Sequence, residues 1–297
     1  MIDFISFGLN YLKSRMFGSK SAAAYYQNIG DDVIPFRNNK FENNSKPMWL
    51  NLGYWEKATT YDKACEDLAL QLSQCINLNE SDHLLDVGFG LGEQDFLWMN
   101  KYNPLSIKGL NITPLHVEVA NKRLSQTSYG DRIRFMEGSA TEMPFNEEEF
   151  TKLTALECAF HFNTREKFFT EAFRVLKPGG VLGIADMAPL KNEKFNNFWQ
   201  KRSRRYMCFP DENMYCAETY KEKLEKAGFS NVTIKSIAGY VYGGAGKYIM
   251  KRVSNKSLGP KDLEVIISEK DLKKGPKIWG FDFGTSDYLL IRAVKPS

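Results

Sequence analysis

The chain has 297 residues, of which 43% are hydrophobic, and its 40 Lys and Arg against 36 Asp and Glu leave a net charge of only +4. This balance is typical of a globular protein that buries its own core, and it gives no support to nucleic acid as the main partner. No apolar run reaches the roughly 18 residues that span a bilayer, and five cysteines without a CxxC pair favour a reduced, cytoplasmic protein without a structural metal.

Residues 1–60 are predicted to form an N-terminal helix followed by an aromatic arm. Apolar side chains at near-helical spacing in the first third of this segment predict a helix that packs on the protein or a partner, with a membrane surface as the alternative. The rest is rich in aromatic residues without a steady period. It is therefore expected to lie over another part of the protein, either as a packing arm or as a substrate lid. Tyr26, Trp49 and Tyr54 are its candidates for cofactor or substrate contact.

From residue 61 onward, helical and strand patterns alternate. Apolar residues at every fourth position predict a helix over 61–76. Strands are predicted over 83–87, 107–112, 132–136, 150–156 and 181–185, with helices between most of them. This alternation predicts a parallel sheet covered by helices on both faces, in which ligands bind at the carboxyl ends of the strands.

Beyond residue 186 the pattern is looser. A helix is predicted over 217–227, and strands over 232–237 and 288–293. The segments near 190–216 and 239–280 are expected to form cap elements on the substrate side of a single domain that spans 61–297.

The most informative stretch is LLDVGFGLG at residues 84–92, in which an apolar strand runs into Asp86 and then into Gly88, Gly90 and Gly92. Glycine can adopt positive φ angles and lets a ligand lie against bare main chain. The dinucleotide fingerprint places its third glycine one position later. The spacing therefore argues against a nicotinamide-dependent oxidoreductase, which remains the alternative enzyme class.

This stretch resembles motif I of the class I S-adenosylmethionine-dependent methyltransferases. Three later stretches resemble further family motifs in the correct order: GLNITPLH at 109–116, GSATEMPF at 138–145 and EAFRVLKPGG at 171–180. The resemblance is closest to a small-molecule subgroup that includes sterol, phosphoethanolamine and natural-product methyltransferases. It implies a Rossmann-like seven-stranded sheet that ends in an antiparallel pair, S-adenosylmethionine as cofactor, and a small, partly hydrophobic methyl acceptor from secondary metabolism.

The resemblance also implies a set of cofactor contacts, two of which depart from the family pattern. Asn111 and Ser139 stand where the family usually has carboxylates, so the pocket is expected to be less acidic than most. These losses motivate a second alternative, a catalytically silent binding protein that kept the fold. The implied cofactor-binding residues are Asp86, Gly88, Gly90, Gly92, Asn111, Ile112, His116, Ser139, Ala140 and Glu157.

The stretch LECAFHF at 156–162 follows the fourth predicted strand and resembles an ALExxxHF element whose histidine projects at the methyl-transfer site. A neutral imidazole near pH 7 can take the proton of a hydroxyl group. His161 is therefore the predicted general base, and O-methylation is favoured, with nitrogen and carbon acceptors left open. The alternative for His161 is a buried, hydrogen-bonded histidine. Glu157 either orients His161 or contacts the cofactor.

Two basic pairs, Lys201-Arg202 and Arg204-Arg205, are more typical of a solvated surface than of a nucleic-acid site. No nucleic-acid partner is expected, and the oligomeric state, monomer or homodimer, stays open.

Overall fold

The computed structural model describes residues 47–192, 208–254, 277–278, 281–282 and 286–297. The predicted N-terminal helix, Tyr26 and most of both predicted cap segments lie outside these ranges. Among the helices of the described ranges, none combines the length and apolar character needed to cross a bilayer.

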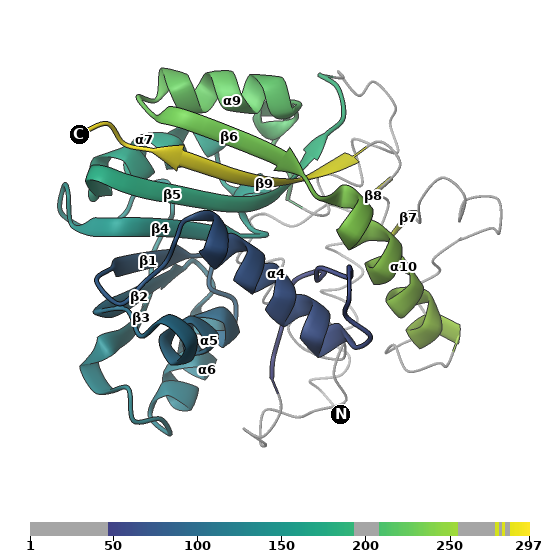
Figure 1. The fold of residues 1–297 in the computed structure, drawn as a ribbon, viewed down its shortest axis with the longest axis horizontal. Coiled ribbons are helices and arrows are strands. Elements are labelled where there is room, and N and C mark those ends of the chain that lie inside the picture. The colour runs from purple at the N-terminus through teal and green to yellow at the C-terminus, as the bar shows by residue number, and fades with distance from the viewer. Residues whose placement is uncertain (1–46, 193–207, 255–276, 279–280, 283–285) are drawn as a thin grey trace, which may run out of the picture.

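A seven-stranded sheet forms the centre of the fold, with strand order β3-β2-β1-β4-β5-β9-β6 (Figure 1). Its strands are β1 His83–Val87, β2 Ser106–Asn111, β3 Ile133–Glu137, β4 Phe150–Leu156, β5 Leu176–Pro189, β6 Ser230–Ser236 and β9 Ser286–Val294. Strands β1 to β5 run parallel, and β9 runs antiparallel to both β5 and β6. The seven-stranded sheet and its antiparallel end are therefore confirmed. Two short strands, β7 Lys277–Ile278 and β8 Phe281–Asp282, pair separately.

Helices cover both faces of the sheet because successive strand residues point to opposite sides. On β1, Leu84 belongs to a core cluster with α4 and α5, whereas Leu85 belongs to a second cluster with α7 and α9. The helices are α4 Tyr61–Cys75, α5 Glu93–Tyr102, α6 Pro114–Leu124, α7 Arg165–Val175, α9 Ala217–Lys226 and α10 Ala238–Ser254, with single 3-10 turns at η2 Gly130–Arg132, η3 Ala159–His161 and η4 Asp211–Asn213.

Two elements differ from the sequence prediction. Strand β5 begins directly at Leu176, which pairs with Phe150 of β4, and it reaches Pro189 because β9 pairs with it from residue 181 to that end. The first part of the 239–280 segment is the helix α10, which places Val241 and Ile249 in the same core cluster as α4.

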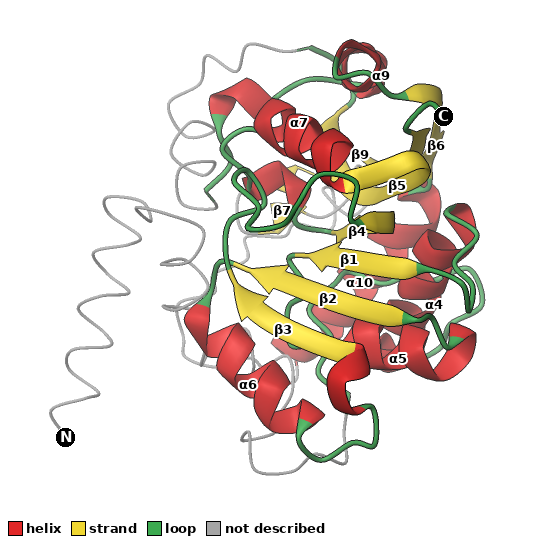
Figure 2. Ribbon diagram, turned by 90° about the vertical axis from the view of Figure 1, so that its left-hand side faces the viewer, coloured by secondary structure: helices red, strands yellow, loops and turns green. Residues whose placement is uncertain are grey.

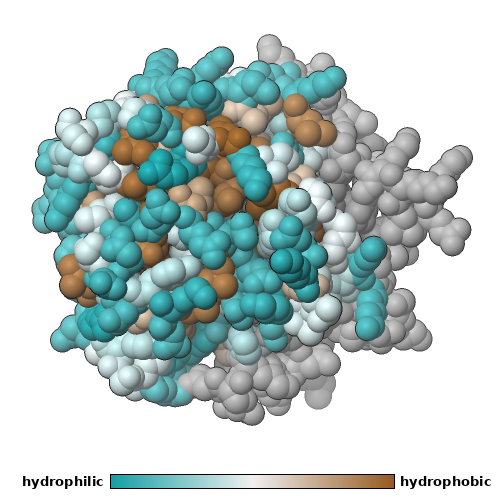
Figure 3. All heavy atoms as spheres, in the orientation of Figure 1, coloured by the Kyte–Doolittle hydropathy of each residue, from teal (hydrophilic) through white to brown (hydrophobic). Residues whose placement is uncertain are grey.

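The face shown in Figure 1 is largely hydrophilic, with hydrophobic side chains gathered over β5, β9 and β6 (Figure 3). The carboxyl ends of β1, β2 and β3 lie together at one edge of the sheet (Figure 2). That edge is where ligands bind in open parallel sheets.

Candidate functional site

A cavity of about 580 Å³ lies at the carboxyl ends of the parallel strands. Its walls come from the turn after β1, the end of β2, the turn after β3, the segment after β4, the arm before α4, and residues 208–210. Most of the residues implied by the family resemblance are thereby brought together. Those that line the cavity are Gly88, Gly90, Asn111, Ile112, His116, Ser139, Ala140, Glu157 and His161.

The turn after β1 is built from glycines in the left-handed region. Gly88 has a φ of +74°, and a β-carbon there would lie 2.6 Å from Cys158 Sγ. Gly90 has a φ of +58°, and its β-carbon would approach Leu50 Cδ1 to 3.3 Å. The turn therefore needs glycine both for its backbone angles and for space, and it presents bare main chain to the cavity.

Asp86 and Gly92 are the two predicted cofactor residues that do not line the cavity, because they stand behind this turn. Asp86 is fully buried and accepts hydrogen bonds from Thr154 Oγ1 at 2.7 Å and Gln94 Nε2 at 3.0 Å. Burial raises the pKa of Asp86 to about 7, although both hydrogen bonds oppose the shift. Gly92 caps α5 and packs against Phe135.

Gln94, which Asp86 holds, lines the cavity and was missed by the sequence prediction. Its position in the first turn of the helix after the glycine turn is a usable signal, because helix N-termini at such turns face the ligand edge. Only its bond to Asp86 shows how the side chain is oriented.

Asn111 both lines the cavity and shapes a turn. Its Oδ1 accepts a hydrogen bond from Thr113 N at 3.0 Å, so part of its acceptor capacity is used within the loop. His116 is buried, and desolvation lowers its pKa to about 4, which leaves a neutral imidazole at pH 7. Ser139 Oγ lies 2.9 Å from Thr141 Oγ1, so this hydroxyl also fixes its own turn. This wall of the cavity thus presents neutral polar groups.

The described part of the arm crosses the glycine turn. Glu93 Oε2 accepts from Met48 N at 2.6 Å, and Glu157 Oε2 accepts from Leu52 N at 2.9 Å. Leu50 and Asn51 line the cavity between these two anchors. The predicted contacts Trp49 and Tyr54 do not.

Trp49 and Tyr54 are only 5% and 6% exposed, and both belong to the core cluster of α4. Tyr54 packs against Tyr240 of α10 with a ring separation of 5.0 Å. Their aromatic surface is used for packing against the core that α4 and α10 help to form.

Glu157 joins the arm to the sheet. Its Oε2 also accepts a hydrogen bond from Tyr288 OH at 2.7 Å, on β9. Burial raises the pKa of the carboxyl to about 7, against the opposing effect of the two hydrogen bonds. Near neutral pH the group is close to its midpoint.

His161 lies on η3, immediately after the turn that follows β4. Its Nδ1 is 3.4 Å from the carbonyl oxygen of Cys208, and its ring stacks on Phe209 with a centroid separation of 5.4 Å. His161, Phe162, Cys208 and Phe209 all line the cavity, and we name them the histidine group. We name Gly88, Gly90, Gln94, Asn111 and Ser139 the glycine-turn group. Across the described ranges, no set of three or more His, Cys, Asp or Glu side chains could hold a metal ion.

Comparison with known proteins identifies the family. The methyltransferase domain family matches residues 85–184. Over 99% of its length the chain is 36% identical to the erythromycin 3''-O-methyltransferase of Saccharopolyspora erythraea, of which it covers 96%. The chain belongs to the class I S-adenosylmethionine-dependent methyltransferases. It is a methyltransferase of the small-molecule type, with S-adenosylmethionine as cofactor, and the nicotinamide-dependent alternative does not apply.

Solved structures show how widely this methyltransferase fold is shared. The geranyl diphosphate C-methyltransferase of Streptomyces coelicolor A3(2) aligns with a TM-score of 0.67 at 14% identity, covering 91% of this chain and 97% of that one. The [4+2]-cyclase SpnF aligns with a TM-score of 0.67 at 18% identity, covering 94% and 97%. Since these names include different reactions, the acceptor chemistry of this methyltransferase has to be argued from its site.

Proposed function

We propose that this methyltransferase acts on a hydroxyl group of a small, partly hydrophobic natural product, with His161 as the general base. The observation that carries the proposal is that His161 and the glycine turn line one cavity. A base and a donor site must share a cavity if a hydroxyl is to lose its proton while it attacks the methyl group.

The glycine-turn group fits the cofactor. Gly88 and Gly90 offer main chain without side chains, and Gln94 and Asn111 offer amide groups beside them. The volume of about 580 Å³ lies in the usual range for small-molecule sites. S-adenosylmethionine, when bound, supplies an electrophilic methyl group on a sulfonium centre. The protein's part is to hold that centre in line with the acceptor and to exclude water.

The histidine group suits proton removal from a hydroxyl. When the Nδ1 proton of His161 faces the carbonyl oxygen of Cys208, Nε2 carries the lone pair that accepts the acceptor's proton. Stacking on Phe209 holds the ring plane. Phe162 and Phe209 make this part of the wall apolar, which favours a hydrophobic acceptor.

The name of the relative supports the same reading. Erythromycin 3''-O-methyltransferase is named for transfer to oxygen on a natural product, and its similarity to this chain extends over nearly the whole of both proteins. We infer a related class of acceptor, a hydroxylated natural product with substantial apolar surface.

The test is product identification. The purified enzyme is incubated with S-adenosylmethionine carrying a deuterated methyl group and with a panel of hydroxylated macrolides and other glycosylated natural products. Each is paired with its deoxy analogue, and products are assigned by mass spectrometry and NMR. We expect label on oxygen, lost in the deoxy analogue. Label on nitrogen or carbon would contradict the proposal. Donor binding without transfer to any acceptor would favour the silent binding protein.

A further inference from the structure

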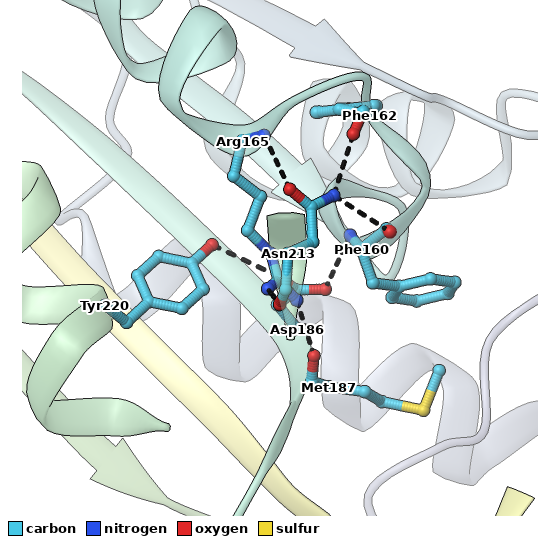
Figure 4. Close-up of polar contacts among 7 residues, drawn as sticks. All are labelled: Phe160, Phe162, Arg165, Asp186, Met187, Asn213 and Tyr220. Atoms are coloured by element: carbon cyan, nitrogen blue, oxygen red, sulfur yellow. Dashed lines mark hydrogen bonds and ion pairs between the residues drawn. The ribbon is translucent and has the colours of Figure 1, made fainter. Parts of the chain in front are cut away.

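The main chain on both sides of His161 is held by buried side chains from elsewhere in the fold (Figure 4). Asn213 Nδ2 donates to the carbonyl oxygens of Phe160, at 3.1 Å, and Phe162, at 2.7 Å. Phe160 N donates to Asp186 Oδ1 at 3.1 Å. The residues directly before and after His161 are thus fixed by hydrogen bonds that cross 26 to 53 positions of the sequence.

Asn213 and Asp186 are in turn held by Arg165, at the start of α7. Asn213 Oδ1 accepts from Arg165 N at 2.9 Å, and the guanidinium donates to the carbonyl oxygen of Asn213. Arg165 Nε lies 2.8 Å from Asp186 Oδ2, and Nη2 donates to Met187 O at 2.6 Å. Tyr220 OH adds a bond to Asp186 at 3.2 Å. The side-chain amide of Asn213 has partners on both its oxygen and its nitrogen.

This arrangement is buried almost completely. Asp186 and Tyr220 are 0% exposed, Arg165 is 1% exposed and Asn213 is 2% exposed. An ion pair in such a place commonly adds little to stability compared with apolar packing, because both charges lose their hydration. What the arrangement does supply is one fixed conformation, since every buried donor and acceptor must keep its partner. The segment that it fixes is the turn that carries His161.

The segment that contains Asn213 also reaches the ring of His161. Cys208 and Phe209 contact the imidazole, and Asn213 follows them on η4. One short segment therefore contacts both the ring and the main chain of the histidine turn.

We propose that Asn213, held by Arg165, is a positioning residue that sets the place of the His161 ring in the cavity. The proposal rests on the function proposed above for His161. It assigns Asn213 a role in the rate of transfer rather than in donor binding, because none of its described hydrogen bonds involves the glycine-turn group. Small displacements of a reacting group commonly cost one to two orders of magnitude in rate.

The decisive variant is Asn213→Asp. It keeps the side-chain volume and the acceptor for Arg165 N, but it replaces the amide donor that faces two carbonyl oxygens. Asn213→Ala is the second variant, in case the first does not fold. Ser73→Ala is the matched control, because Ser73 is a fully buried polar side chain on α4 with bonds to Leu70 O and Tyr102 OH.

We expect either Asn213 variant to lower kcat roughly 10- to 100-fold, with the donor Kd changed less than about twofold. In a His161→Ala background the same substitution should lower the residual rate less than twofold, because it acts through His161. Imidazole NMR gives an independent readout, since the chain has only 3 histidines. The His161 signals should shift while those of His83 and His116 stay in place.

An unchanged kcat in both Asn213 variants would overturn the inference. An equal loss in the wild-type and His161→Ala backgrounds would overturn it too, because the effect would then be general. If His161→Ala alone keeps full activity, the proposed function fails, and the Asn213 inference fails with it because it rests on His161 as the base. If His161→Ala is inactive and Asn213→Asp is not, only the inference fails.

Discussion

Gly88, Gly90 and Asn111 shape the cavity through their own backbone angles and short-range bonds, whereas His161 depends on Arg165, Asp186 and Asn213 for the place of its main chain. The conformation of the glycine turn depends mainly on its own glycines at positive φ, with one main-chain bond from Gly88 N to Leu110 O of β2. The histidine turn is held by side chains from α7, β5 and η4. The comparison teaches that one cavity can be lined both by a turn that its own glycines shape and by a turn, carrying the proposed base, that side chains from distant segments hold.

The largest expected effect separates the two groups by function. His161→Ala should lower kcat by about 10²–10⁴-fold and leave the donor Kd nearly unchanged, since a general base contributes about that much. Steady-state kinetics and calorimetry measure the two quantities. His83→Ala is the control, because His83 begins β1 at the opposite end of the strand and bonds Ser106. A loss below tenfold would make His161 a structural residue.

The next prediction concerns donor binding rather than kcat. Gly90→Ala should weaken donor binding roughly 100-fold, because the new methyl group enters the bare main-chain surface beside Leu50. Gly130→Ala is a close control: Gly130 has a φ of +56° with nothing within 4 Å of its β-carbon, so it carries the same backbone strain without a contact. Equal donor Kd values for the two variants, measured by calorimetry, would contradict the role of the glycine turn.

A gain of affinity should follow from restoring a family carboxylate. Asn111→Asp keeps the acceptor for Thr113 N and adds a charged oxygen at the end of β2, where the family resemblance implies a carboxylate. Charge-assisted hydrogen bonds are about twice as strong as neutral ones, so donor affinity should rise about 3- to 10-fold. Calorimetric titration checks this. An unchanged Kd would mean that the donor does not reach Asn111.

The last prediction concerns folding stability and the bond between the arm and the sheet. Glu157 has its pKa raised by burial from 4.5 to about 7, so the folded protein holds a proton that the unfolded chain has lost in this window. Stability from this group is therefore present below pH 4.5 and lost as the pH rises through about 7. Asp86, also raised to about 7, acts with the same sign.

Glu157→Gln should remove part of the stability that wild type loses as the pH rises. Both Leu52 N and Tyr288 OH donate to the same oxygen, and an amide oxygen can accept both bonds. We expect the variant to be more stable than wild type at pH 8 by about 1–2 kcal/mol, with little difference at pH 5. Thermal unfolding at the two pH values measures this. The same pH dependence in both proteins would show that Glu157 stays ionised when folded.

Much of the glycine-turn side of the cavity could be anticipated from the sequence because its residues follow strands directly. The spacing of Gly88 and Gly90 and the position of Asn111 at the end of β2 are local properties, and the structure brings them to one edge. Which residues of the arm line the cavity could not be anticipated in this way. Trp49 and Tyr54 turned inward while Leu50 and Asn51 faced the cavity, because the packing of α4 and α10 decides which side of an irregular segment is buried.

The sequence by itself determined the order of strands and helices, the glycine turn and the histidine that follows β4, since each depends on neighbours a few positions away. Only the tertiary structure decided that Asn213 donates to the carbonyl groups on both sides of His161, that Gln94 is held by Asp86, and that β5 extends along β9. The physical reason is that hydrogen bonds between buried groups far apart in the chain require both partners to be in place. No local pattern of residues records which distant carbonyl or carboxylate a side chain will meet.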